Sequence, residues 1–565
     1  MQAQQGEQLP VPDSGGAALG APVTVHGVVK NALSGEPLAR ALVQVDGGGG
    51  TGALTDGDGR FEIPGIGLGP NTFQITKPGY EDAGGMPAGA ALRDMRGWSH
   101  NVFVVNETPE LVFQLRPSNS IRGRVDLSTG DPANNLITLI RCDVVNGRSV
   151  WHPMGGTRVD SDGMYHFAHL QDGDYAVVAE PSPESDLVAL PATGEPDRNN
   201  ASNWYAQTYY PDARDFSGAA RIHVSGGEQA QANFSLPLER FHAVRATLEL
   251  PAAFRAGEKM PGAQFEITTL DGHHLPYPAA YKDNSITAML PDGSYTMQGT
   301  VFAPQSDAIA LRIAEATSHS GPVLRVRTGL TGQLDFTVAG RALGKLRVPV
   351  GPVTPTPIQL DVNRTSTKAA RPGNHGEVFV EISPAGPLAD GMQSMFAQGS
   401  GPGAIETNPP SPGRYWVHTI VADSTLCEGS FVAGAANLGR EPLVVGQSGV
   451  TSQLTLTLRD DCASLTLSLP ANASGLAAGE EPAYTVYVVP DFDFTTEAPS
   501  RTLRASTGPT ATLNNLTPGS YRIYVFSAPV DLEYHNRESL AGFPSQSVTL
   551  APGDTQSITL EVPAQ

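Results

Sequence analysis

Charged residues, and basic ones above all, are scarce in this chain of 565 residues. Only 16% of the residues are charged, and 36 Lys and Arg face 57 Asp and Glu, for a net charge of −21. Phosphate binding needs a concentrated basic surface, so we expect no nucleic acid partner, and an anionic membrane surface is disfavoured for the same reason. No stretch approaches the roughly 18 uninterrupted apolar residues of a membrane-spanning helix, so no transmembrane segment is expected.

The motifs of common enzyme and metal sites are also missing. The sequence has no H-E-x-x-H, no G-x-S-x-G, no P-loop and no dinucleotide-binding fingerprint in a β–α context. An H-x-x-E pattern runs from His535 to Glu538, but no histidine follows it that could serve as a third ligand. We therefore expect no metal, no cofactor and no enzymatic activity, and an enzyme with an unrecognised site is the least favoured hypothesis.

Glycine (62) and proline (47) are abundant, while hydrophobic residues make up 40% of the chain. Such a composition is too apolar for a disordered chain and too rich in turn formers for a helical one. The glycines lack the three-residue period of collagen, so they indicate turns between many short strands. Because the length is about four times that of an ordinary domain, we expect several all-β domains.

An internal repeat divides the chain. Four phrases place a glycine two residues before a tyrosine, and these tyrosines are 120, 120 and 106 residues apart: LQDGDYAVV with Tyr175, LPDGSYTMQ with Tyr295, PSPGRYWVH with Tyr415 and LTPGSYRIY with Tyr521. A degenerate fifth copy, LGPNTFQI, has Phe73 in the tyrosine position. The phrase predicts a tight turn and then a strand that buries the ring, with the tyrosine hydroxyl bonded back across the corner as in β-sandwiches.

The repeat predicts a tandem array of about five antiparallel β-sandwich domains, prealbumin-like or immunoglobulin-like, arranged as a chain of beads. Strands with period-2 patterns open and close the units: 328–338 is expected to close the third unit and 344–350 to open the fourth. The expected division is a flexible N-terminal tail at 1–21 and sandwiches at 22–117, 118–239, 240–340, 341–460 and 461–565.

The first unit carries a specific pattern of residues. It consists of Gly27 in the first strand, the turn SGEPL at 34–38, Ala41 and Val43 in the next strand, Thr55-Asp56 with Gly59-Arg60-Phe61, and Pro78-Gly79-Tyr80. This pattern resembles the carboxypeptidase regulatory-like domain, a prealbumin-like (transthyretin-like) β-sandwich, as found in bacterial exported repeat proteins. The second unit is similar through Gly123, Val159-Asp160 and Gly163-Met164-Tyr165. In metallocarboxypeptidases this domain is an appendage without zinc ligands, so the resemblance implies a non-catalytic domain.

The chain has three cysteines, two of which are candidates for a disulfide. Cys427 and Cys462 are 35 residues apart and flank one predicted unit. A bond between them would contribute about 3–4 kcal/mol by closing this loop; the alternative is two unconnected small apolar residues. Cys142 is expected to be a buried strand residue without chemistry. The start MQAQQ resembles a mature terminus left after removal of a signal peptide, and together with the disulfide it predicts a secreted, periplasmic or cell-surface protein.

Two long loops contain the candidate binding residues. One spans 80–100 in the first unit, and the other spans 181–210 in the second and ends in NWYAQTYY. Loops of this length within compact sandwiches are often functional. The candidates for an aromatic platform that stacks on sugar rings or on a partner chain are Trp98, Trp204, Tyr205, Tyr209 and Tyr210. The alternative is that these rings cover the sandwich end or the junction between the first two units.

Two functions are therefore carried forward. The first is a non-catalytic exported protein whose sandwiches act as a binding or spacer module at the bacterial cell surface or in the periplasm. The second is a carbohydrate-binding accessory protein for a glycoside hydrolase or peptidase system. The expected partner is a polysaccharide or a protein, and the chain is expected to be a monomer.

Overall fold

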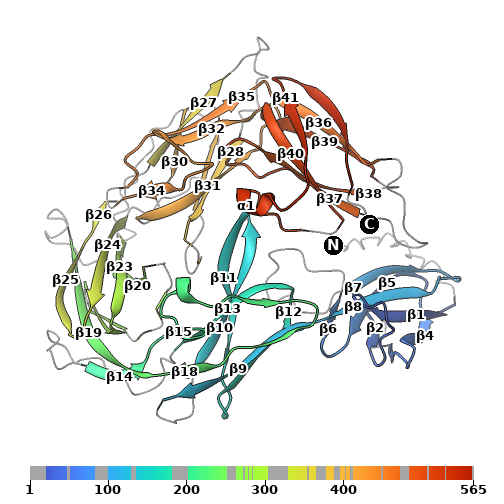
Figure 1. Cartoon of the computed structure of the whole chain (residues 1–565), viewed down its shortest axis with the longest axis horizontal. Helices are drawn as coiled ribbons and strands as arrows, with labels where there is room; N and C mark the ends of the chain where they lie inside the picture. Colours follow the sequence, from blue (N-terminus) through green and yellow to red (C-terminus); the bar gives the residue numbers. More distant parts are fainter. Residues whose placement is uncertain are drawn as a thin grey trace, which may run out of the picture. The chain divides into compact units, whose positions relative to one another are not determined.

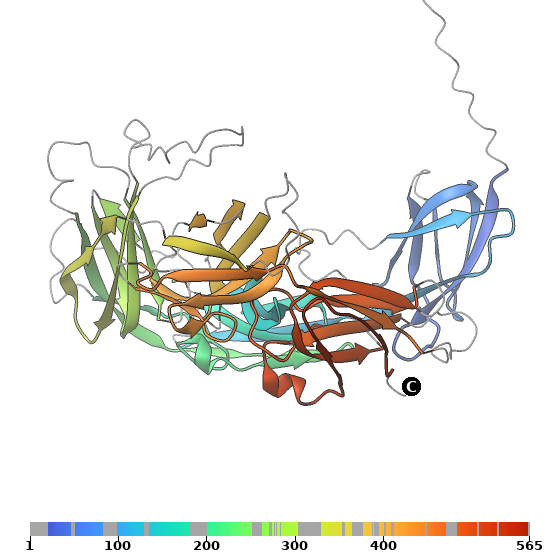
Figure 2. The ribbon, with the colours of Figure 1, turned by 90° about the horizontal axis from the view of Figure 1, so that it is seen from above.

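The described part of the chain consists almost entirely of β-strands. The computed structural model describes residues 21–46, 51–82, 99–128, 135–180, 201–250, 263–270, 274–275, 277, 279–282, 284–302, 329–352, 356–363, 377–386, 388, 395–400, 403–407, 412–446, 449–470, 483–504, 508–527 and 530–562. Its helices in these ranges are α1 (Arg537–Leu540) and a 3-10 turn (Phe216–Gly218), and neither is long and apolar enough to cross a membrane. The described strands form ten small sheets, which make up a tandem array of β-sandwich domains (Figure 1, Figure 2).

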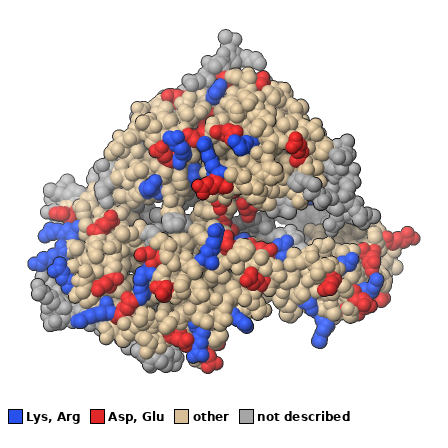
Figure 3. Space-filling view, in the orientation of Figure 1, with Lys and Arg blue, Asp and Glu red and all other residues tan. Residues whose placement is uncertain are grey.

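The chain divides into two compact units. One contains 1–124, 164–175 and 221–233, and the other contains 125–163, 176–220 and 234–565. Residues 234–565 of the second unit carry three of the predicted sandwiches. On the face shown in Figure 3, acidic and basic side chains are interspersed.

The first sandwich has one sheet in the order β4-β1-β8-β6 and another in the order β3-β2-β5-β7. Its core includes Phe61, Phe73 and Phe113, whose rings lie 5.8 Å apart in each neighbouring pair. A Cβ at Gly27 would lie 2.3 Å from the Phe61 ring, so this strand position accepts only glycine. The strands are β1 (Val23–Asn31), β2 (Leu42–Asp46), β3 (Gly52–Leu54), β4 (Arg60–Ile66), β5 (Gly69–Thr76), β6 (Tyr80–Asp82), β7 (Ser99–Val104) and β8 (Leu111–Pro117).

The segment predicted as the second sandwich forms one sheet in the order β12-β9-β17, with β18 paired to β9, and another in the order β11-β10-β13-β15, with β16 paired to β13. The hairpin β10–β11 is the longest antiparallel pair of this sandwich, with register from Leu136 opposite Arg158 to Val145 opposite Arg148. The strands are β9 (Asn119–Leu127), β10 (Leu136–Val145), β11 (Arg148–Arg158), β12 (Met164–Leu170), β13 (Gly173–Glu180), β15 (Thr208–Tyr209), β16 (Ile222–Val224), β17 (Gln229–Gln231) and β18 (Phe234–Leu236).

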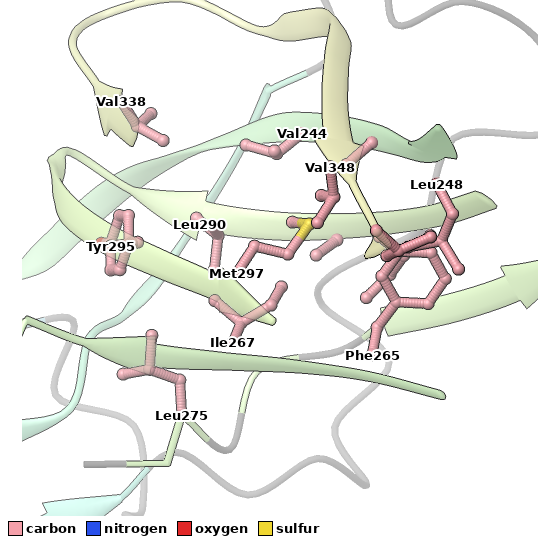
Figure 4. Packing of buried hydrophobic residues seen from close by; sticks show 14 of the residues in the cluster. Val244, Leu248, Phe265, Ile267, Leu275, Leu290, Tyr295, Met297, Val338 and Val348 are labelled. Atoms are coloured by element: carbon pink, nitrogen blue, oxygen red, sulfur yellow. The ribbon is translucent and has the colours of Figure 1, made fainter. Parts of the chain in front are cut away.

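The third sandwich has sheets in the orders β14-β19-β22-β21 and β20-β23-β24-β26, with β25 paired to β19. Both sheets contribute to its core, in which Met297 of β23 lies between Leu290 of β22 and Ile267 of β20 (Figure 4). The strands are β14 (Ala201–Tyr205), β19 (Leu238–Glu249), β20 (Ala263–Thr269), β21 (Ala279–Lys282), β22 (Ser285–Pro291), β23 (Gly293–Phe302), β24 (Gly329–Val338), β25 (Leu343–Pro349) and β26 (Gly351–Pro352).

The fourth and fifth sandwiches each have a separate core of buried Leu, Val, Ile and Tyr side chains. The fourth has sheets β30-β27-β35-β32-β33 and β29-β28-β31-β34, and the fifth has β39-β36-β42 and β38-β37-β40-β41. The strands of the fourth are β27 (Thr356–Asn363), β28 (Glu377–Pro384), β29 (Met395–Ser400), β30 (Gly403–Thr407), β31 (Gly413–Val421), β32 (Cys427–Ala433), β33 (Ala436–Asn437), β34 (Leu443–Val445) and β35 (Leu454–Arg459). Those of the fifth are β36 (Ala463–Ser468), β37 (Ala483–Pro490), β38 (Ser500–Arg504), β39 (Thr510–Leu516), β40 (Gly519–Phe526), β41 (Gln546–Leu550) and β42 (Thr555–Thr559).

In each sandwich an early strand pairs in parallel with a late one: β1 with β8, β9 with β17 and β18, β19 with β25, β27 with β35, and β36 with β42. This rule corrects the predicted boundary at 340/341. The segment 344–350 does not open the fourth unit, because β25 closes the third sandwich by pairing with β19. A period-2 pattern shows which face of a strand is buried but not which strand it pairs with, so the sequence could not assign it. The other boundaries stay predictions.

The glycine of the repeat phrase has the same partner type in all five copies. It lies opposite a buried aliphatic residue in each case: Gly69 opposite Val104, Gly173 opposite Val224, Gly293 opposite Val338, Gly413 opposite Val445 and Gly519 opposite Leu550. The degenerate copy matches the other four at its glycine but not at its ring: Asn71, opposite Val102, holds the register of the tyrosines, and Phe73 lies two residues further along β5, opposite His100. A Cβ on Gly293 would lie 2.7 Å from the Tyr295 hydroxyl, so in this copy the tyrosine itself excludes a side chain at the glycine position.

The predicted tyrosine corner is confirmed at three of the four repeat tyrosines. The hydroxyls of Tyr175, Tyr295 and Tyr521 each donate to the carbonyl four residues earlier, at 3.0, 2.9 and 2.5 Å. All three rings are buried. Burial raises the pKa of Tyr415, the fourth repeat tyrosine, to about 12, so its hydroxyl stays protonated at neutral pH. The repeat tyrosines thus serve the fold.

Candidate functional site

The predicted aromatic platform is not an exposed surface. Trp204 is 4% exposed, Tyr205 7% and Tyr209 0%, while Tyr210 is half-buried. Trp98 lies outside the described residues. A ring that stacks on a sugar must present a face to solvent, and three of these side chains present none. The stacking platform is therefore not present at these three positions, and the rings do not lie at a junction between the first two units either, because their strands belong to the second and third sandwiches.

The burial of these rings follows from the strands in which they lie. β14 pairs with β19 of the third sandwich and places Trp204 opposite Glu239. β15 pairs with β13 of the second sandwich and places Tyr209 opposite Val178. The aromatic segment therefore contributes strands to two successive sandwiches. Aromatic residues favour strands, so the sequence did carry a signal that this segment forms strands.

The connection between the fourth and fifth sandwiches is short and cross-linked. β35 ends at Arg459 and β36 begins at Ala463, which leaves three connecting residues. One of them, Cys462, forms a disulfide with Cys427 of β32, with 5.9 Å between the two Cα atoms. The guanidinium of Arg459 donates two hydrogen bonds of 2.7 Å to the carboxylate of Asp461 in the same connection. The ion pair between Arg459 and Asp461 thus holds the start of the connection, and the disulfide of Cys462 holds its end.

A buried carboxyl group lies next to this disulfide. Glu428 is 5% exposed, and its side chain accepts hydrogen bonds from the backbone N–H of Thr495 (3.0 Å) and from the Thr495 hydroxyl (2.8 Å). The Thr517 hydroxyl donates to the Glu428 carbonyl (2.6 Å), and the Thr419 N–H donates to the Thr495 carbonyl (3.0 Å). Thr495 and Thr517 belong to the fifth sandwich and the other residues to the fourth. We call this set of contacts, with the disulfide, the fourth–fifth joint.

The fourth–fifth joint is expected to lose stability as the pH rises from about 4.5 to 7. Burial raises the pKa of Glu428 from its usual 4.5 to about 7, against the opposite effect of the Thr495 hydrogen bonds. Between these pH values the folded state holds a proton that the unfolded state has released, so raising the pH favours unfolding.

Urea unfolding midpoints measured from pH 4.5 to 8 would test this expectation. In Glu428→Gln the side chain is neutral at every pH, so the decline should be smaller than in the parent chain. Glu441→Gln alters a half-exposed carboxylate in the same sandwich and should keep the full decline. Equal declines in both variants would contradict the role of Glu428.

A cavity of about 370 Å³ lies between the fourth and fifth sandwiches beside Glu428. Its wall includes His418, Phe492, Asn514 and Tyr521. Burial lowers the pKa of His418, so its imidazole is neutral at pH 7. The lining contains no Lys or Arg. Over the described ranges, no group of three or more His, Cys, Asp or Glu side chains could hold a metal ion. The cavity offers hydrogen bonds and apolar contact.

Two features of this region were not expected from the sequence. Glu428 was not singled out, because one acidic residue after a cysteine in a strand carries no pattern. The dipeptide Asn146-Gly147 was also passed over, although it is the characteristic turn of a two-residue hairpin. It joins β10 to β11 and lies at the tip of a hairpin that contacts the fourth and fifth sandwiches. Cys142 lies in β10, half-buried.

The comparison with protein families identifies one domain type. The model of the carboxypeptidase regulatory-like domain matches residues 24–92. The match agrees with the resemblance seen in the first unit and covers the strands β1 to β6. It spans less than half of the chain. A comparison with curated proteins gives no match.

Solved structures with similar folds include pilins. They are the Bacillus anthracis TIE protein (11% identity, 78% of this chain, 68% of that chain, TM-score 0.14), GBS52, the minor pilin of Streptococcus agalactiae (12%, 42%, 99%, 0.18) and BcpA, the major pilin subunit of Bacillus cereus (10%, 61%, 99%, 0.14). Identities and TM-scores of this size carry no argument about function.

Proposed function

We propose that this chain is a non-catalytic structural protein whose sandwiches act as a spacer, with a protein as its partner. The observation that carries this proposal is the fourth–fifth joint. Domains joined by ordinary linkers move relative to one another by default. Here a three-residue connection, a disulfide and hydrogen bonds to Thr495 hold two neighbouring sandwiches together. A spacer needs such a joint, because its length depends on the placement of its domains.

The disulfide also supports an exported protein. Disulfides form and persist in oxidising compartments, such as the bacterial periplasm and the cell surface, and are rare in the cytosol. The bond between Cys427 and Cys462 is therefore best suited to a protein that acts outside the cytoplasm. The proposed location is the periplasm, the cell surface or the medium.

The carbohydrate-binding alternative has no observation in its favour among the described residues. It depended on an aromatic platform, and three of its four described rings are buried. The repeat tyrosines do not replace this platform, since they are buried at the corners of their strands.

The proposed function is tested with the full chain on a glycan array and with peptide, ester and polysaccharide substrates, together with metal analysis. The expected result is no glycan binding, no turnover and no stoichiometric metal. Turnover that is lost in Glu428→Gln, or stoichiometric zinc, would overturn the non-catalytic assignment. Glycan binding that is lost on mutation of Tyr210, the half-buried candidate, would favour the accessory protein instead.

A further inference from the structure

The hairpin β10–β11 projects a tight turn away from its own sandwich. Asn146 and Gly147 form the turn with φ angles of +48° and +69°, which match the twist of a two-residue hairpin. We call residues 143–150 the hairpin tip. The tip lies beside α1 of the fifth sandwich (Figure 1), and the residues that contact it belong to the same compact unit.

The hairpin tip is bound by the segment just before α1. The Gly147 carbonyl accepts a hydrogen bond of 3.1 Å from the backbone N–H of His535. The Tyr534 ring packs directly on Gly147, since a Cβ at this glycine would lie 2.3 Å from the ring. Ser149 donates a hydrogen bond to the carboxylate of Glu533. Three successive residues of the fifth sandwich thus contact two residues of the hairpin tip, Gly147 and Ser149.

The fourth sandwich binds the charged residue of the tip. The Arg148 guanidinium lies over the Trp416 ring, 3.5 Å from its centroid, and its Nη2 donates to the Gly439 carbonyl at 3.2 Å. Burial lowers the pKa of Arg148 to about 10, so the group remains a cation at neutral pH. A guanidinium on the face of a tryptophan is a favourable cation–π arrangement, and it strengthens as the pair is desolvated.

A second contact lies further down the hairpin. Trp151 of β11 forms a bridge with Leu388 of the fourth sandwich, and Leu388 is fully buried in a cluster with Ile140, Tyr209 and Phe216. The hairpin is therefore held at its tip by polar and cation–π contacts and along its length by apolar ones. The fourth and fifth sandwiches have their own hydrophobic cores, so release of the tip does not require either of them to unfold.

We propose that the site formed by Trp416, Gly439 and Tyr534 is a recognition surface for the Gly147-Arg148 turn, and that the hairpin acts as a latch. The docked tip ties the hairpin β10–β11 to the fourth sandwich, 291 residues further along the chain, and to the fifth, 384 residues further. This inference goes beyond the proposed function, because that proposal depends on the fourth–fifth joint alone. When the latch is released, this surface becomes exposed.

The latch is tested by hydrogen exchange in the full chain, with two matched glycine variants. Gly147 and Gly340 have nearly the same positive φ, +69° and +65°, so alanine causes similar backbone strain at both. An added Cβ meets the Tyr534 ring at Gly147 but no atom within 4 Å at Gly340. We expect Gly147→Ala to speed the exchange of amides 533–536 and 143–150 by about tenfold, with β36 and β42 unchanged. Gly340→Ala should leave both segments at the parental rate.

A second variant keeps the proposal falsifiable if Gly147→Ala fails to fold. Arg148→Gln removes the cation on Trp416 without backbone strain and should speed exchange of amides 533–536 and 143–150 by about tenfold to thirtyfold. Arg501→Gln, which removes an exposed arginine bonded to its neighbour's carbonyl, is its control and should change neither segment. Unchanged exchange at 533–536 in Arg148→Gln, or equal exchange in the two glycine variants, would overturn the latch.

Discussion

Replacing Tyr521 by alanine is expected to lower the free energy of unfolding of the fifth sandwich by about 3–5 kcal/mol. The ring is 2% exposed and packs in the core of this sandwich, edge-on to Phe492 at 5.5 Å. Truncation removes this apolar surface from the core and leaves a cavity between the two sheets. Urea unfolding of the full chain, followed by a probe in the fifth sandwich, measures the loss.

The tyrosine corner itself contributes a smaller part. Tyr521→Phe keeps the ring and removes the hydroxyl that donates to the Thr517 carbonyl, so we expect a loss of about 1–2 kcal/mol. Phe543→Ala, a matched aromatic truncation at a residue that is 40% exposed, should cost about 1 kcal/mol, less than Tyr521→Ala. If Tyr521→Ala lowered the free energy of unfolding by less than Phe543→Ala does, the assignment of Tyr521 to the core would be contradicted.

Removing the disulfide is expected to cost about 3–4 kcal/mol of the unfolding free energy of the joined fourth and fifth sandwiches. The bond closes a loop across 35 residues and restricts the unfolded chain. The comparison is between the parent chain and Cys427→Ser/Cys462→Ser, both measured by urea unfolding without reductant. The parent chain should lose the same free energy when reductant is added.

Cys142→Ser is the control for this experiment, because it changes the remaining thiol of the chain and keeps the disulfide. Its response to reductant should equal that of the parent. An unfolding midpoint of the double serine variant equal to that of the parent would show that the bond does not support the fourth–fifth joint.

The parts of this fold that the sequence predicted are those set by local contacts. The turn glycine and the buried tyrosine are two residues apart in each of the four copies, so the repeat could be recognised from the letters alone. The cysteine pair was expected from its spacing, and the structure contains the bond. Contacts of this kind connect residues that are neighbours or carry a rare side chain.

The parts that the sequence did not predict depend on partners far along the chain. The strand at Leu343–Pro349 alternates like any half-buried strand, and only its pairing with β19 shows that it belongs to the third sandwich. Trp and Tyr side chains are common both in binding surfaces and in buried strands. The residue types alone therefore do not show that Trp204 and Tyr209 are buried. Arg148 gives no sign in the sequence that its partner is Trp416, since the two are more than 260 residues apart.

The most direct test of the account is the distance between spin labels on the fourth and fifth sandwiches. Val444→Cys in β34 and Thr502→Cys in β38 place labels at exposed sites, in a chain that carries Cys142→Ser and keeps the native disulfide. The account predicts one narrow distance distribution for this chain and a broader one when Cys427 and Cys462 are replaced by serine. A broad distribution in the disulfide-bonded chain would contradict the claim that the fourth–fifth joint is rigid.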